Sequence, residues 1–158
     1  MAATTTPYRA LTPEQRVALI QRVMQANKVT RTLFVQRILD KGRGFRAVTV
    51  EKWPTAQLAK EVVRMKAESA QDEFDLLLAL YVELDPSVQV TFLEAAGVKH
   101  EKGVIDEELE PPYADEAGVK RAVAAVRAAH GEQGEHYLSV LVYYNKDVWP
   151  GLEAAIGG

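Results

Sequence analysis

The chain has 158 residues, of which 47% are hydrophobic and 26% are charged, and it contains no cysteine. These proportions exclude a disordered tail, a collagen-like fibre and a membrane bundle. The lack of cysteine excludes disulfide bonds, a thiolate nucleophile and metal sites built on cysteine.

The longest apolar run, residues 76–82, is far shorter than the roughly 20 residues that a membrane span requires. Residues 1–9 contain no apolar run of signal-peptide length. The sequence therefore predicts a cytoplasmic protein that does not enter a membrane. Its compact, Ala-rich composition favours a bacterial source.

The charges are unevenly distributed along the chain. Residues 1–70 contain 13 Lys and Arg against 5 Asp and Glu, a net charge of +8, whereas residues 71–158 contain 6 against 17, a net charge of −11. Such asymmetry indicates a polyanionic partner for the basic half, docking of opposite charges, or two solvated surfaces that merely differ in charge.

The N-terminal part reads as a helical hairpin. Thr12 precedes a proline and is followed three residues later by Gln15, an arrangement typical of a capping box, so a helix is predicted from residue 13. Asn27 and Lys28 interrupt the apolar periodicity. Thr30 is the predicted N-cap of a second helix, which ends at the glycine of residue 42.

The central part reads as a connector followed by three helices. Residues 42–53 contain two closely spaced glycines and are predicted to be a connector, with residues 48–50 as a short extended piece. A helix is predicted from residue 55, a strongly apolar one over residues 72–84, and another from Asp85 and Pro86 to Gly97.

The C-terminal part begins with an acidic connector over residues 98–113. Asp115 is the predicted cap of the next helix, residues 131–134 are a predicted turn, and helices follow at residues 135–144 and 148–156. The whole chain is thus predicted to be one all-α domain, a helical bundle of about seven or eight helices.

Two segments resemble each other, residues 55–97 and residues 115–157. Their alignment places Leu78 on Leu138 and Val82 on Val142. We expect an N-terminal hairpin packed on two similar three-helix units, because neither unit alone has a comfortable core. Leu78 and Leu138 should then be buried at equivalent positions.

One candidate binding site is a weak basic patch in the N-terminal half. Five cations follow one another through the second helix and its exit loop: Arg31, Arg37, Lys41, Arg43 and Arg46. Such a cluster could neutralise phosphates. The turn at Asn27 lacks the glycine favoured in a helix-turn-helix, however, and few aromatics interleave with the cations, so nucleic acid is possible but not favoured.

The second candidate is a weak metal site at His130 and His136, with Glu132 and Glu135 between them. The six-residue spacing across two glycines favours a polar turn instead. No serine lies in a nucleophile elbow, and the glycines near residue 43 lack a following Gly-Lys-Ser/Thr sequence. No catalytic residue, metal or cofactor is therefore predicted.

The most favoured function is a non-enzymatic helical protein-interaction or adaptor module, with an unidentified protein partner or a second copy of the chain. The first alternative is a nucleic-acid-associated protein that uses the basic N-terminal half. The second alternative is an enzyme that binds a small molecule or a metal.

Overall fold

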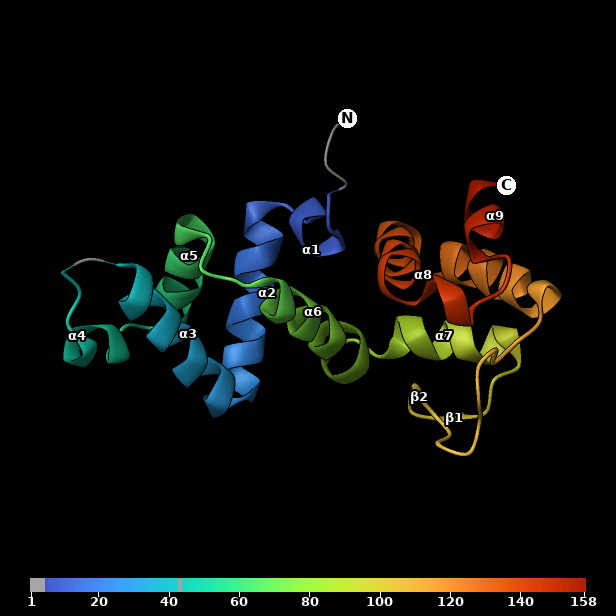
Figure 1. The fold of residues 1–158 in the computed structure, drawn as a ribbon, viewed down its shortest axis with the longest axis horizontal. Helices are drawn as coiled ribbons and strands as arrows, with labels where there is room; N and C mark the ends of the chain where they lie inside the picture. Colours follow the sequence, from blue (N-terminus) through green and yellow to red (C-terminus); the bar gives the residue numbers. More distant parts are fainter. Residues whose placement is uncertain (1–4, 43) are drawn as a thin grey trace. The chain divides into compact units, whose positions relative to one another are not determined.

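The computed structural model describes residues 5–42 and 44–158, and 73% of the chain is helical (Figure 1). The strands of the described part form only one two-stranded antiparallel hairpin. The predicted all-α class is therefore confirmed. The chain divides into two compact units, Met1–Leu80 and Tyr81–Gly158, called unit 1 and unit 2 below.

The described residues of unit 1 form six α-helices, which pack around a core of hydrophobic side chains. Their bounds are α1 (Pro7–Ala10), α2 (Pro13–Ala26), α3 (Lys28–Lys41), α4 (Ala47–Glu51), α5 (Thr55–Met65) and α6 (Ala70–Leu78). The helix α2 packs on α3, α5 and α6, and α1 packs on α6. The fully buried residues at the centre include Ile20, Phe34, Ile38, Leu58 and Val62.

Side-chain caps explain where the first helices begin. Thr12 accepts a hydrogen bond from the amide of Gln15, whose side chain accepts one from the Thr12 amide, so the predicted capping box is confirmed. The predicted cap of the second helix was wrong. Asn27 takes that position instead of Thr30, because its side-chain oxygen accepts hydrogen bonds from the amides of Val29 and Thr30.

The predicted connector over residues 42–53 contains a short helix, α4, where an extended piece was expected. Val50 is fully buried, and this single anchor fixes the inner face of α4. Before α4 the ring of Phe45 meets that of Trp53 edge to face, with centroids 5.2 Å apart. Two apolar contacts therefore order a segment whose local sequence gives only a weak helical signal.

The helix α6 begins with a second capping box, formed by Ser69 and Asp72. The segment that follows, η1 (Ala79–Leu84), is π-helical, so the predicted helix over residues 72–84 is not uniform. The boundary between units 1 and 2 falls within η1.

Unit 2 is built on two long elements, α7 (Ser87–Ala96) and α8 (Glu116–Asn145), which pack on each other. The remaining elements are β1 (His100–Glu101), β2 (Val104–Ile105), η2 (Lys146–Val148) and α9 (Leu152–Gly157). Phe92 of α7 contacts Tyr137 and Trp149 edge to face, with ring centroids 5.9 Å and 4.9 Å apart. These three buried aromatic residues join the parts of unit 2.

The acidic segment predicted to be a connector contains the hairpin β1–β2. His100 pairs with Ile105, and Glu101 pairs with Val104. The two residues between the strands, Lys102 and Gly103, both have positive φ, as a tight hairpin turn requires. The predicted helix start at Asp115 and helix end at Gly97 are confirmed, since Asp115 caps α8 and Gly97 ends α7 with a φ of 77°.

The predicted turn at residues 131–134 is a kink within α8. Gly131 has φ 54° and ψ −125°, a conformation that no helix contains. A Cβ atom on Gly134 would lie 2.7 Å from the carbonyl oxygen of Val126. The second half of α8 therefore approaches the first half closely, and only a glycine fits at the contact.

The predicted internal repeat does not give Leu78 and Leu138 equivalent surroundings. Leu138 is 0% exposed in α8, whereas Leu78 is 49% exposed at the end of α6, so the expectation of shared burial was wrong. The boundary between units 1 and 2 also falls inside the first aligned segment, residues 55–97.

Among the described residues, no single helix is both long and apolar enough to span a membrane. The segments Ala70–Leu84 and Ser87–Ala96 reach the required length and composition only when they are taken together, and the chain is bent between them.

Candidate functional site

The asymmetry of charge follows the two compact units. Unit 1 contains 13 Lys and Arg against 8 Asp and Glu, a net charge of +5, and unit 2 contains 6 against 14, a net charge of −8. Unit 1 is therefore net basic, and unit 2 is net acidic.

The predicted basic patch of unit 1 is largely engaged within the protein. Arg31 donates hydrogen bonds to the carbonyl oxygens of Glu51 and Trp53, at 2.9 Å and 3.1 Å. This places the Arg31 guanidinium at the end of α4, where unpaired carbonyl groups attract cations.

Lys41 and Arg37 have similar structural contacts. Lys41 donates to the carbonyl oxygens of Met65 and Lys66 at the end of α5, at 3.0 Å and 2.9 Å. Arg37 forms an ion pair with Asp72, 3.5 Å away. Arg46 is exposed next to α4, and Arg43 lies outside the described residues. The structure therefore separates three of the five predicted cations into distinct intramolecular contacts.

The two histidines of the predicted metal site point to different partners. The Nε2 atom of His130 lies 2.9 Å from the Thr91 hydroxyl, and the Nδ1 atom of His136 lies 2.6 Å from the Tyr81 hydroxyl. In the described part of the chain, no three His, Cys, Asp or Glu side chains gather into a group that could hold a metal ion. Both histidines instead extend the polar contacts that fasten α8 within unit 2.

A cluster that the sequence analysis missed lies at the start of α6. Glu68, Asp72 and Glu73 are only 6%, 4% and 8% exposed. Buried carboxylates are costly unless cations and hydrogen bonds compensate them. The sequence signal was a capping-box pattern at Ser69, which identifies the helix start but not the burial around it.

The α1 segment supplies most of the partners for these carboxylates. Tyr8 donates a hydrogen bond to Glu68, and Thr6 donates one to Glu73 at 2.7 Å. Arg9 lies 3.8 Å from Glu68 and 3.6 Å from Glu73. Burial, and secondarily the Glu68 carboxylate, raises the pKa of Tyr8 well above its usual range. The cluster therefore fastens α1 to α6 through charge and hydrogen bonding.

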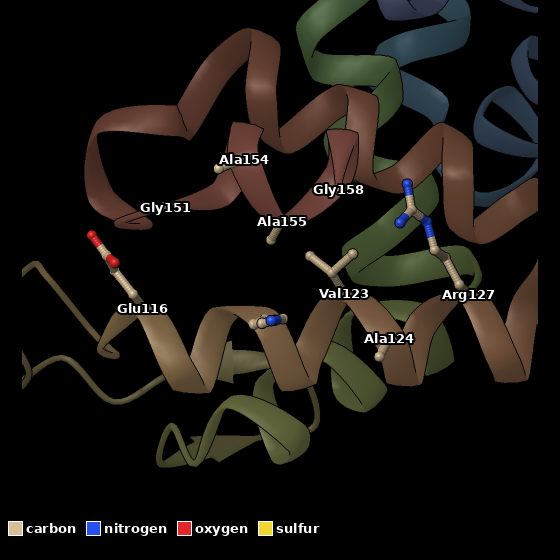
Figure 2. Close-up of a pocket in the computed structure, with 9 residues that line it drawn as sticks. Glu116, Val123, Ala124, Arg127, Gly151, Ala154, Ala155 and Gly158 are labelled. Carbon is tan, nitrogen blue, oxygen red and sulfur yellow. The ribbon is translucent and has the colours of Figure 1, made fainter.

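Unit 2 contains an open groove of about 480 Å³ between α8 and α9 (Figure 2). Its lining residues are Glu116, Lys120, Val123, Ala124, Arg127, Gly151, Ala154, Ala155 and Gly158. Figure 2 shows Val123 and Ala155 directed into the space between the two elements, with Glu116 near one end and Arg127 near the other. The groove thus combines an apolar, small-residue floor with charged ends.

Two contacts hold the walls of the groove in place. Arg127 donates hydrogen bonds to the carbonyl oxygen of Ile156 in α9 and to the carboxylate of Glu135, both at 2.5 Å. Leu152 of α9 is buried against the core of unit 2. The helix α9 is therefore anchored at both of its ends, which keeps the groove open between them. The groove was not predicted from the sequence, because spaced Ala and Gly residues are also common in tightly packed helices.

Comparisons with protein families, curated proteins and solved structures give no significant match. The function must therefore be inferred from the groove, the buried cluster and the charges.

Proposed function

We propose that the chain is a non-enzymatic helical interaction module, and that the groove between α8 and α9 holds a helical segment of a partner protein. The observation that carries this proposal is the open groove with its floor of small apolar residues. Its lining is mostly apolar, with charged groups at Glu116, Lys120 and Arg127. The cytoplasmic location predicted from the sequence remains part of the proposal.

The dimensions of the groove favour a helix as the occupant. Glu116 and Arg127 are eleven residues apart on α8, so the groove extends for roughly 16 Å at 1.5 Å per residue, or about three helical turns. Alanine and glycine in the walls allow the backbone of an incoming helix to approach closely. An amphipathic helix laid in a groove is a common way of recognising a partner protein.

The other features of the molecule favour a protein partner over nucleic acid or a substrate. Arg31, Arg37 and Lys41 bind carbonyl or carboxylate groups of unit 1, so phosphate contacts would compete with contacts that stabilise the fold. The carboxylates at the start of α6 are buried against Tyr8 and Arg9, where a substrate would have to displace α1.

A site-specific photo-crosslinking experiment tests the proposal. A photoreactive amino acid replaces Ala154, an exposed residue that lines the groove, in cells that express the protein. The matched control carries it at Ala128, an exposed residue of α8 that does not line the groove. We expect a protein adduct of defined mass from position 154 only.

The purified partner should then bind the unmodified chain and should bind the Ala155→Leu variant, in which the added side chain enters the groove, at least tenfold more weakly. Equal adducts at both positions, or unchanged binding to Ala155→Leu, would contradict the proposal. An adduct between two copies of the chain would identify self-association.

A further inference from the structure

We infer that α1 is a removable internal ligand, and that the carboxylate cluster against which it packs is a binding site for a Tyr-Arg turn of another protein. The carboxylate cluster is formed by Glu68, Asp72 and Glu73 at the start of α6. Asp72 caps α6 and pairs with Arg37, so the other two carboxylates are those that contact α1. The cluster lies in unit 1 and the groove in unit 2, so this inference goes beyond the proposed function and does not rest on it.

The helix α1 shows which groups the site recognises. The Tyr8 phenol donates a hydrogen bond to Glu68, and the Thr6 hydroxyl donates one to Glu73 at 2.7 Å. Arg9 lies 3.8 Å from the first carboxylate and 3.6 Å from the second. One helical turn thus presents a phenol, a hydroxyl and a guanidinium to two buried carboxylates. The occupant is a segment of peptide, so a peptide is the class of ligand that the site fits.

The match between α1 and the carboxylate cluster is incomplete. The Glu68 side chain is 0% exposed, and its Oε1 atom has no hydrogen-bond partner in the part of the chain that the structure describes. Both Arg9 distances exceed the roughly 2.7–3.2 Å of an N–H···O hydrogen bond. A buried carboxylate oxygen without a donor is destabilising. A ligand whose guanidinium reaches this oxygen would therefore bind better than α1 does.

The helix α1 can leave the site while α2 stays folded. Figure 1 shows α1 as a separate short helix before α2, and only two of its four residues are buried. The cap of α2 is formed by Thr12 and Gln15 with each other, without any group of α1. Arg16 of α2 holds the carbonyl oxygen of Leu11 at 3.3 Å, so the pivot lies just before that carbonyl group. Short segments of this kind open at a lower free energy than the whole domain.

The tether between α1 and α2 decides which ligands can enter. Two residues join the helices, so α1 competes for the site at an effective concentration in the millimolar range or above. The apparent affinity for a free ligand falls by the fraction of molecules in which α1 has left. A second copy of the chain offers only the same α1 and gains nothing by exchange. The site therefore favours another protein, whose arginine supplies the donor that Glu68 lacks.

A peptide with the sequence of residues 5–12 tests the inference. Nuclear magnetic resonance titrations measure its dissociation constant with the full chain and with the Tyr8→Ala, Arg9→Ala double variant. We expect a dissociation constant of about 1 mM or less with the double variant and at least tenfold weaker binding to the unmodified chain, because the intact α1 competes. A control peptide with Tyr8→Phe and Arg9→Ala should bind the double variant at least tenfold more weakly.

Variants of the site locate the bound peptide. Glu73→Gln, added to the double variant, should weaken peptide binding at least tenfold, because a charged acceptor is lost. The matched control Glu51→Gln changes an exposed carboxylate of α4 and should leave the binding unchanged. Ala155→Leu, which fills the groove of unit 2, should also leave it unchanged.

Native-state proteolysis tests the removal of α1 in the unmodified chain, even if the double variant does not fold. Trypsin cleaves the Arg9–Ala10 bond only after α1 has unwound, and it cleaves the Arg22–Val23 bond only after α2 has unwound. Relative to free peptides of the same sequences, we expect cleavage after Arg9 to be at least tenfold faster than cleavage after Arg22. Equal relative rates would show that α1 leaves only when unit 1 unfolds, which overturns the inference.

The binding outcomes are equally decisive. The inference is overturned if the double variant is folded and binds the peptide no more tightly than the unmodified chain, or if the control peptide binds equally well. It is also overturned if Ala155→Leu abolishes binding, because the peptide would then lie in the groove of unit 2. None of these results contradicts the proposed function, whose test uses positions 154 and 155.

Discussion

Tyr8 donates a hydrogen bond to the carboxylate of Glu68, sixty residues further along the chain. Tyr8 is 0% exposed, and so is the Glu68 side chain. Arg9 is 3.8 Å from the other carboxylate oxygen of Glu68, which has no hydrogen-bond partner among the described residues. The tyrosine hydroxyl is therefore the main group that compensates this buried carboxylate, and it ties α1 to the start of α6.

Removing that hydroxyl should destabilise unit 1. We expect Tyr8→Phe to lower the free energy of unfolding by about 2–3 kcal/mol, because Glu68 would remain buried without its donor. Urea unfolding measures the change, and hydrogen exchange should locate it in α1 and α6. The control is Tyr143→Phe at a 46% exposed tyrosine, for which a change within about 0.5 kcal/mol is expected. Equal effects of both variants would contradict the role assigned to Tyr8.

Three buried tyrosines should make the protein sensitive to alkali. Burial is the main cause that raises the pKa values of Tyr8, Tyr81 and Tyr137 above the ordinary value near 10. The folded state therefore binds these protons more tightly than the unfolded state does. Their contribution to stability is fully present below pH 10 and is lost as the pH rises above 10 towards the folded pKa values.

Each such tyrosine should reduce the free energy of unfolding by about 1.4 kcal/mol per pH unit above pH 10. Urea unfolding between pH 9 and pH 11.5 measures the slope, and absorbance at 295 nm reports tyrosinate formation. Tyr81→Phe should make the slope shallower by one such increment than in the unmodified chain. If Tyr81 ionises near pH 10 in the folded protein, the prediction is wrong.

Local sequence patterns identified most of the helices in this chain, but they missed the short helices α1 and α4 and the contacts between distant residues. The capping box at Thr12 and the cap at Asp115 depend on neighbours three residues away, and both were predicted correctly. The burial of Glu68 depends on Tyr8, and the order of α4 depends on the burial of Val50. Contacts across tens of residues leave no periodic signal in the sequence, so these features were missed.

The roles of the candidate site residues also depend on contacts that the sequence does not reveal. Arg31 and Lys41 look like surface cations in the sequence, and only the fold shows that they bind the carbonyl groups at the ends of α4 and α5. The groove depends on α9 lying beside the first half of α8, which requires the kink at Gly131 and the turn at Gly151. Residue types predicted neither arrangement.

The two leucines that the sequence alignment matched should respond differently to truncation. We expect Leu138→Ala to cost about 2–5 kcal/mol, because a fully buried side chain leaves a cavity in unit 2. Leu78→Ala should cost less than about 1 kcal/mol, because that side chain is half exposed. Thermal and urea unfolding provide the comparison. If both variants lost a similarly large part of the free energy of unfolding, the prediction would be contradicted and the two positions would be equivalent.

The basic residues of unit 1 should affect stability more than nucleic-acid binding. We expect Arg31→Ala to cost about 1–2 kcal/mol of stability, since two backbone carbonyl groups lose a charged donor that is partly exposed. Arg46→Ala, at an exposed position, should change stability by less than about 0.5 kcal/mol. A mobility-shift titration with DNA and RNA at low salt completes the test. A shift that weakens steeply with salt and is lost in both variants would favour the nucleic-acid alternative.

The kink of α8 should depend on the absence of a side chain at Gly134. A methyl group there would lie 2.7 Å from the Val126 carbonyl oxygen and 2.8 Å from a Val126 methyl group, and the backbone atom cannot move without opening the kink. We expect Gly134→Ala to cost about 1–3 kcal/mol of stability, in the range of other overpacked substitutions. The control is Gly157→Ala, because a Cβ atom at Gly157 meets nothing within 4 Å. A variant that is as stable as the original chain would show that the two halves of α8 do not approach each other as closely as the structure indicates.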